Sequence, residues 1–284
     1  MKLLRDARAV HGIVSAWSAA GARVALVPTM GNLHRGHLRL VEVARRRADR
    51  VVVSVFVNPT QFGPSEDFAA YPRTLAADRS SLLSAGADAL FIPSVRVMYP
   101  RGLSGAATVS IPLLSRELCG AFRPGHFDGV CSVVLRLFNM VAPHIAVFGE
   151  KDYQQLTVLR QMAADLHLTV RLIGVPTVRE RDGLAMSSRN QYLGPAERVH
   201  APLLAATLRE VIASVRGGRR DYARLERDAM RRLRNAGFRP DYVAVRRAGD
   251  LGAPERGERS LRVLAAAWLG RARLIDNLPL RLSR

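Results

Sequence analysis

Two histidines three positions apart, His34 and His37, are the residues whose types and spacing most directly suggest chemistry. They follow Val24–Pro28, an apolar run typical of a short buried strand, and a helical spacing of apolar residues begins at Leu38. A helix N-terminus presents backbone N–H groups and the positive end of the helix dipole, and two imidazoles one turn apart add further donors. The stretch therefore predicts a binding site for a phosphate chain. The alternative is that one or both histidines only cap the turn.

Polar clusters follow three expected strands, at the point where each strand ends. The run PTMGNLHRGH follows Val24–Val27, NPTQFG follows Val51–Val57, and GEKDYQQ follows Ile145–Phe148. In a doubly wound parallel sheet, ligands bind beyond the carboxyl ends of the strands. A solvated loop would explain any one cluster, but three clusters predict that the strand ends converge on one crevice.

The periodicity of the chain predicts strands that alternate with helices. Residues 1–23 are expected to be a helix, and the remaining elements of the first part are expected as helices at 80–85, 129–141 and 156–166 and strands at 89–92, 109–111 and 169–175. This order is typical of an α/β fold, here a Rossmann-like doubly wound parallel sheet spanning 1–176. From 177 to 284 the pattern changes to helices at 195–216 and 221–236, then apolar runs at 242–245 and 261–268, which predicts a smaller α+β domain.

Length and composition set broad limits on the class of protein. A chain of 284 residues with 48% hydrophobic residues can bury a full core. The first residues lack a secretory apolar segment, and no run approaches the ~18 apolar residues of a membrane span. We therefore expect a cytoplasmic protein without a membrane partner. Cys119 and Cys131 have no metal-ligand spacing and are expected to be buried, reduced thiols.

The formal net charge of +19 raises the possibility of a nucleic-acid partner, because basic surfaces attract phosphate backbones. Apart from Lys2 and Lys151, however, every basic side chain other than histidine is arginine, and the arginines are scattered along the chain. A general preference for arginine explains the charge, and we expect no nucleic-acid partner. In such a chain, an interior lysine at 151 suggests a position that requires a compact ammonium group.

At the level of whole motifs, the sequence resembles the pantothenate synthetase family of the nucleotidylyltransferase superfamily. The resemblance rests on the histidine motif, NPTQFG, YPRT at 71–74, RPGHFDG at 123–129, GEKDYQQ at 149–155 and DGLAMSSRN at 182–190. It runs from about Pro28 to Leu193, in order. The pair GEKDYQQL and LAMSSRN is specific, whereas H-x-G-H alone would indicate only the superfamily.

The resemblance implies an ATP-dependent, AMP-forming ligase that condenses pantoate with β-alanine through a pantoyl adenylate. ATP would be a substrate, with Mg²⁺ required, and the small-molecule partners would be pantoate and β-alanine. His34 and His37 would stabilise the α-phosphate under attack, with His37 as a proton donor, and Lys151 would be the third catalytic residue. Positioning and charge stabilisation suffice for such chemistry, without a covalent nucleophile. The family is usually dimeric, so we expect a homodimer.

The same resemblance assigns a larger set of binding residues. The nucleotide-binding positions would be Met30, Gly31, Asn32, Leu33, His34, Arg35, Gly36, His37, Gly149, Glu150, Lys151, Asp152, Val178, Met186, Ser187, Ser188 and Arg189. Gln61 and Gln155 would bind pantoate, which suits amides that both donate and accept hydrogen bonds. No protein metal ligand is assigned: Asp78 lies near a position for a magnesium contact, but we interpret it as a surface residue of a helix. Arg123 could reach phosphate or cap a loop and is left unassigned.

Arg35 departs from the family pattern, in which the residue between the histidines is usually acidic. We expect its side chain to point to solvent. Two other functions remain as alternatives: nucleotidyl transfer onto a phosphate acceptor, and a nucleotide sensor without catalysis. The paired glutamines and the DGLAMSSRN run argue against the first, and the intact His34, His37 and Lys151 argue against the second.

Overall fold

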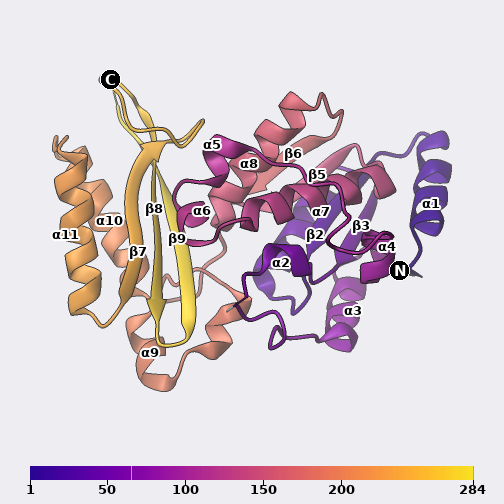
Figure 1. The fold of residues 1–284 in the computed structure, drawn as a ribbon, viewed down its shortest axis with the longest axis horizontal. Helices are drawn as coiled ribbons and strands as arrows, with labels where there is room; N and C mark the ends of the chain where they lie inside the picture. The colour runs from indigo at the N-terminus through magenta and orange to yellow at the C-terminus, as the bar shows by residue number, and fades with distance from the viewer. Residues whose placement is uncertain (65, 284) are drawn as a thin grey trace. The chain divides into compact units, whose positions relative to one another are not determined.

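The structure is a computed structural model that describes residues 1–64 and 66–283 (Figure 1). The chain forms two compact units, the first made of Met1–Glu150 and Val158–Pro176, the second of Lys151–Thr157 and Thr177–Arg284. The domain ranges 1–176 and 177–284 stay a prediction, and the compact units depart from them only at 151–157. Among the described residues, no helix is both long enough and apolar enough to span a membrane.

The first unit contains a six-stranded parallel sheet with the strand order β1-β4-β3-β2-β5-β6. Its strands are β1 (Lys2–Leu4), β2 (Val24–Thr29), β3 (Arg50–Val55), β4 (Ala89–Phe91), β5 (Ile145–Gly149) and β6 (Arg171–Val175). The chain proceeds outward from β2 through β3 to β4 and then returns to place β5 on the other side of β2. This reversal is the topological switch point of a doubly wound sheet, where ligands characteristically bind. The predicted fold class is confirmed.

Helices cover both faces of this sheet (Figure 1). Of these, α1 (Ala7–Ala19), α2 (Arg35–Arg45) and α7 (His126–Val141) contact the strands. The other helices as far as β6 are α3 (Leu75–Ser84), α4 (Val95–Met98), α5 (Pro112–Ser115), α6 (Cys119–Phe122) and α8 (Tyr153–Asp165), with short 3₁₀ turns η1 (Pro59–Gln61) and η2 (Glu150–Asp152). Helix α2 packs on β2, β3, β5 and β6, with Leu40 and Val41 buried against Val27 of β2 and Val53 of β3. Since these strands are buried on both faces, their sequences are almost continuously apolar.

Several expected elements of the first unit differ from the structure. The first residues form β1, an edge strand paired with β4, and not part of a helix. Residues 109–111, expected as a strand, belong to no strand, because Val109 donates its N–H to the Ser132 hydroxyl and Pro112 begins α5. Helices α3, α7 and α8 begin before the expected residues 80, 129 and 156. The first turns of α7 and α8 are mostly polar, and in α3 the buried Asp78 interrupts the apolar spacing.

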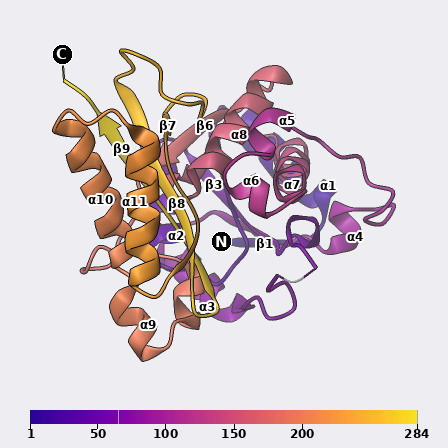
Figure 2. The same ribbon diagram turned by 60° about the vertical axis from the view of Figure 1, so that its left-hand side comes forward.

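The second unit has an antiparallel sheet of β7 (Arg239–Arg247), β8 (Ser260–Leu269) and β9 (Ala272–Arg281). Its helices are α9 (Pro195–His200), α10 (Leu203–Arg216) and α11 (Tyr222–Asn235), and η3 (Ser188–Tyr192) is a 3₁₀ turn. Figure 2 shows α10 and α11 together along one face of the sheet, where Leu208 and Leu233 pack with Val245 and Val263.

Two details of the second unit differ from the sequence-based expectation. The expected helix at 195–216 is divided into α9 and α10, because Pro202 has no N–H with which to continue the first helix. Strand β9 was not expected, since Asp276, Asn277 and Pro279 interrupt its apolar pattern. Both cysteines are buried thiols as expected, and burial, with Asp128 nearby, raises the pKa of Cys131 to about 12.

Candidate active site

His34 and His37 are held at the N-terminus of α2 by a reciprocal capping arrangement. His34 Nδ1 accepts the backbone N–H of Gly36 at 3.1 Å, and His37 Nδ1 accepts the backbone N–H of His34 at 3.2 Å. The ring centroids are 4.0 Å apart. Because each Nδ1 is an acceptor, the proton of each neutral ring is on Nε2. The histidines therefore cap the turn, and the same bonds make each ring an Nε2–H donor beside the positive end of a helix dipole.

The turn that joins β2 to α2 is fixed by Asp78, which corrects the surface interpretation of that residue. Asp78 is only 2% exposed, and its carboxylate accepts the backbone N–H groups of Asn32 at 3.0 Å and Leu33 at 2.8 Å. It also accepts the hydroxyl of Thr74 at 3.2 Å. Gly31 has a φ of +82°, and a Cβ there would lie 3.1 Å from Asp78 Oδ2, so glycine suits the position in both conformation and space.

Gln61, which follows β3 in the turn η1, lies against the residue that follows β2. Its Nε2 donates to the Met30 sulfur at 3.0 Å, and its Oε1 accepts from Asn58 Nδ2 at 3.2 Å. The structure thus brings together two residues assigned to different substrates, Met30 to nucleotide and Gln61 to pantoate. Met30 is half-buried, so it is not an ordinary core residue.

Asn58 fixes the position of η1 through buried hydrogen bonds. Its side chain is 1% exposed, donates to the Gly129 carbonyl at 3.1 Å and accepts the Tyr99 hydroxyl at 2.7 Å. Burial raises the pKa of Tyr99, which keeps the donating hydroxyl protonated. A Cβ at Gly129 would lie 2.3 Å from the carbonyl oxygen of Thr60, so only glycine allows α7 to approach η1 this closely.

Arg123, which the sequence left unassigned, supports the same turn. It donates to the Gln61 carbonyl at 3.2 Å and binds Glu66 with two hydrogen bonds, Nε to Oε1 at 2.6 Å and Nη2 to Oε2 at 2.5 Å. Nδ1 of His126 lies 2.8 Å from the same carbonyl. Burial raises the pKa of Glu66, but the hydrogen bond and charge of Arg123 outweigh burial and hold that pKa below its usual 4.5. Glu66 and His126 are residues that the sequence reasoning missed.

The three strand ends that carry polar clusters are neighbours in the sheet. Strand β2 lies between β3 and β5, all three are parallel, and so their carboxyl ends share one edge. In the first unit, Met30–His37 follow β2, Gln61 lies in the turn after β3, and Gly149 ends β5 with Glu150 directly after it. Arg35 is exposed, as expected. Among the described residues, no group of three His, Cys, Asp or Glu side chains has the arrangement of a metal site.

Lys151, Asp152 and Gln155 belong to the second unit. Lys151 Nζ lies 3.5 Å from Asp152 Oδ2, and the lysine side chain is 19% exposed. The segment is attached to that unit through its backbone and its tyrosine: the Lys151 carbonyl accepts from Asn277 Nδ2 at 2.8 Å, and the Tyr153 hydroxyl donates to the Ala248 carbonyl at 2.8 Å.

The remaining expected nucleotide contacts lie on a short hairpin and the 3₁₀ turn after it, also in the second unit. Met186 N donates to the Val178 carbonyl at 2.9 Å, and Glu180 N donates to the Leu184 carbonyl at 2.8 Å. Ser187 then caps η3 by accepting the N–H of Arg189 at 3.2 Å. Val178, Met186, Ser187, Ser188 and Arg189 are thereby brought together.

Comparisons with known proteins agree with these motifs. The model of the family described as pantoate-beta-alanine ligase matches residues 2–279. The chain is 55% identical to a pantothenate synthetase of Thioalkalivibrio sulfidiphilus, with 99% of each chain covered, and 54% identical to one of Halorhodospira halophila, with 100% of each covered.

Solved structures of the same family share the fold. A pantothenate synthetase of Thermus thermophilus has a TM-score of 0.90 at 46% identity and covers 98% of this chain and 99% of its own. A pantoate-beta-alanine ligase of Francisella tularensis, solved in complex with beta-gamma ATP and beta-alanine, has a TM-score of 0.82 at 32% identity, covering 98% of this chain and 97% of its own. The resemblance inferred from the motifs is confirmed, and the chain belongs to the pantoate-beta-alanine ligase family.

Proposed function

We propose that this chain joins pantoate to β-alanine in two steps through a pantoyl adenylate. In the first step a pantoate carboxylate oxygen attacks the α-phosphorus of ATP and pyrophosphate leaves. In the second step the β-alanine amine attacks the acyl carbon, AMP leaves, and the amine loses a proton. Membership of the ligase family and the ATP and beta-alanine in the Francisella tularensis complex support this reaction.

The observation that carries the proposal is the paired capping of His34 and His37. Their Nδ1 atoms are occupied by backbone N–H groups, so the rings offer Nε2–H donors at a helix N-terminus that follows the switch-point strand β2. Donors fixed before the reaction stabilise charge that develops on the α-phosphate without any cost of reorganisation. In this role both histidines would bind phosphate oxygens, and His37 would donate its proton.

The other assigned residues would bind the two substrates. Lys151 and Arg189 supply positive charge for the triphosphate, and Ser187 and Ser188 supply hydroxyl groups next to Arg189. Gln61 and Gln155 would bind pantoate, and the contacts of Gln61 with Asn58 and Met30 fix one amide orientation. An amide fixed in this way can distinguish the hydroxyl and carboxylate groups of one substrate.

Magnesium would arrive with ATP. The groups at the histidine turn are imidazole and backbone N–H donors, which suit phosphate oxygens and not a cation, and Asp78 already accepts three hydrogen bonds. Mg²⁺ is commonly bound by substrate phosphates and water with few protein ligands. The metal would neutralise part of the pyrophosphate charge, as part of the substrate MgATP.

Exchange of labelled pyrophosphate into ATP tests the order of the two steps. If the carboxylate is activated first, exchange should occur with MgATP and pantoate in the absence of β-alanine, and omission of pantoate should abolish it. His37→Ala should reduce exchange and the full reaction equally, by about 10²-fold or more. The matched control is His11→Ala, which removes an exposed histidine on α1 and should leave both rates unchanged.

The same assay separates the proposal from its alternatives. Gln155→Ala should raise the pantoate concentration needed for half-maximal exchange, because the variant lacks one of the amides that would bind pantoate. Exchange that appears only after β-alanine is added would refute the adenylate-first order. Exchange with a phosphate acceptor in place of pantoate would indicate nucleotidyl transfer, and ATP binding without any turnover would indicate a sensor.

A further inference from the structure

The middle of β9 carries two polar residues that are almost completely buried. Asp276 is 3% exposed and Asn277 is 2% exposed, although their neighbours Leu274 and Leu280 belong to the apolar core of the second unit. Burial of a charge and an amide is costly unless each is hydrogen-bonded. The partners of these two residues therefore indicate what the polar pair holds in place.

Asp276 holds the hairpin that carries Val178 and Met186. Arg179 Nη1 donates to Asp276 Oδ2 at 2.7 Å and Arg179 Nη2 donates to Asp276 Oδ1 at 2.8 Å, a bidentate pair. Arg179 also donates to the Gly183 carbonyl at 3.0 Å and pairs with Ala185 across the hairpin. One buried carboxylate thus fixes both arms of this hairpin.

Asn277 holds the segment that carries Lys151. Its Oδ1 accepts from Arg262 Nη1 at 2.6 Å, which fixes the amide orientation so that Nδ2 donates to the Lys151 carbonyl at 2.8 Å. The guanidinium carbon of Arg262 lies 3.6 Å from the centre of the Tyr153 ring, so the same arginine also packs on the next part of the segment. The Asn277 N–H donates to Asp276 Oδ1 at 2.7 Å, which joins the two halves.

We infer that Asp276 and Asn277 are positioning residues for ATP, each acting through a different nucleotide-binding segment. Asn277 sets the backbone position from which Lys151 extends, and Asp276 sets the hairpin position of Val178 and Met186. Displacement of a charge-stabilising group by about 1 Å can cost up to about 100-fold in rate, so a fixed backbone at Lys151 affects turnover directly. This inference rests on the proposed function, because it takes the roles of Lys151 and Val178 from there.

A double-mutant cycle distinguishes positioning from a general structural role. Asn277→Asp keeps the shape and the acceptor for Arg262 but replaces the donor to the Lys151 carbonyl. In the wild-type background it should lower kcat/KM for ATP by between about 10-fold and about 100-fold. In a Lys151→Ala background the same substitution should have little further effect, since two residues that act through one group are not additive.

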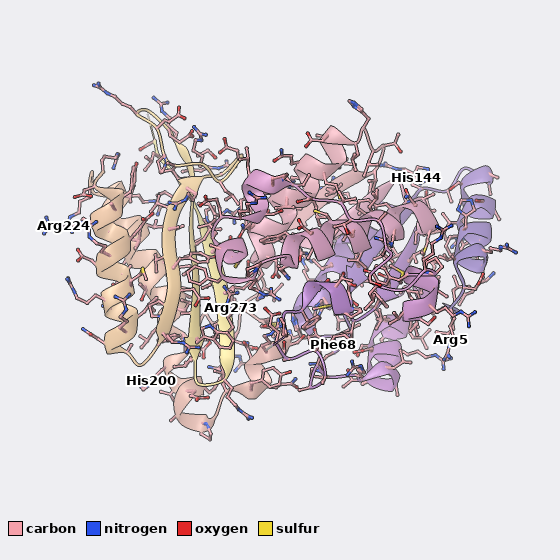
Figure 3. All side chains as sticks on the ribbon, viewed as in Figure 1. Arg5, Phe68, His144, His200, Arg224 and Arg273 are labelled. Atoms are coloured by element: carbon pink, nitrogen blue, oxygen red, sulfur yellow. The ribbon has the colours of Figure 1, made fainter. Side chains whose placement is uncertain are left out.

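Asp276→Asn provides the second arm of the experiment. It weakens the bidentate pair with Arg179, so it should raise KM for ATP, and this effect should persist undiminished in the Lys151→Ala background. The matched control is Asp241→Asn, which disrupts a comparably buried ion pair with Arg273 (labelled in Figure 3), the Asp241 and Arg273 side chains each being 11% exposed. That control should lower the unfolding temperature by an amount similar to the test variants and leave KM for ATP unchanged.

Direct titration of ATP binding distinguishes a failure of the positioning inference from a failure of the proposed function. If Asn277→Asp costs the same factor with and without Lys151, or if Asp241→Asn changes KM for ATP equally, the positioning inference is wrong. A wild type that makes no pantothenate but binds ATP refutes the proposed function, and the cycle is then evaluated from the ATP dissociation constants. A wild type that binds no ATP overturns both.

Discussion

At the scale of single residues, Asp78 shows how a side chain can be misjudged from its own segment. On α3 it lies in the first turn of a helix and is followed by Arg79, Ser80 and Ser81, which favours a surface position. Its burial is decided by residues 45 and 46 positions away, whose backbone N–H groups need an acceptor once the turn after β2 is formed. A carboxylate supplies two acceptor oxygens, one for each N–H.

Asp78→Asn should therefore be costly despite its small change in size. The amide has one acceptor oxygen, so one partly buried backbone N–H would face an NH₂ group, at a cost of about 1–3 kcal/mol in free energy of unfolding. Affinity for ATP should fall as well, because the substitution loosens Met30–His37. Urea unfolding and ATP titration measure the two effects.

Asp6→Asn is the matched control for that substitution. Asp6 also accepts two backbone N–H groups, from Arg8 and Ala9, but through one oxygen and at an exposed helix N-cap. Asparagine caps a helix about as well as aspartate, so the change should stay within about 0.5 kcal/mol. Equal effects of the two substitutions would contradict the role given to Asp78.

Glu66 gives a pH-dependent prediction at the same scale. The net lowering of its pKa by Arg123 means that the ionised form is favoured in the folded state, so the pair contributes stability above pH 4.5. That contribution should be lost as the pH falls below 4.5 and through the lowered folded pKa. The difference in free energy of unfolding between wild type and Glu66→Gln should therefore shrink on acidification.

The exposed pair of Arg39 and Glu42 serves as the control for Glu66. Their side chains are 42% and 52% exposed, and such surface pairs contribute little. Glu42→Gln should change stability by less than about 1 kcal/mol at any pH in the series. A Glu66→Gln difference that stays constant from neutral to acidic pH would show that the Arg123 pair does not depend on ionisation.

At the scale of elements, helix and strand ends carry the groups used by the proposed reaction. The N-terminus of α2 holds the histidines, η1 holds Gln61, and η3 begins at Ser188, next to its cap Ser187. Each of these short elements is capped by a side chain that accepts a backbone N–H. The caps fix local geometry, and the sheets behind them supply rigidity.

Hydrogen exchange tests the hairpin and turn at 179–190 as a nucleotide-binding element. Amides of Glu180 and Met186 are bonded across the hairpin, whereas those of Arg189 and Asn190 bond to the neighbouring Ser187 within one turn. The added protection on binding of MgATP and pantoate should therefore fall chiefly on 187–190. Binding commonly orders loops that exclude water from a hydrolysable intermediate. Helix α11 is the internal reference and should not change. Unaltered exchange at 187–190 would count against nucleotide contact there.

At the scale of the whole molecule, the alternation of strands and helices determined the fold class correctly, and the family match over 2–279 confirms the family that the motifs indicated. The homodimer expected from the resemblance stays a prediction. Edge strands were the main errors of the fold prediction. β1 is three residues long, too short to show an alternating apolar pattern. In β9, buried polar residues interrupt that pattern.

The sequence by itself determined the chemistry that adjacent residues share. His34 and His37 are three positions apart, so a helix N-terminus and its two imidazoles could be deduced locally. Only the tertiary structure decided which side chains hold these groups. Asp78 acts 46 positions from Asn32, Arg123 acts 57 positions from Glu66, and Asn277 acts 126 positions from Lys151. Such partners meet because packing of the sheet and helices closes the intervening loops. No local sequence pattern indicates which distant residues that packing brings together.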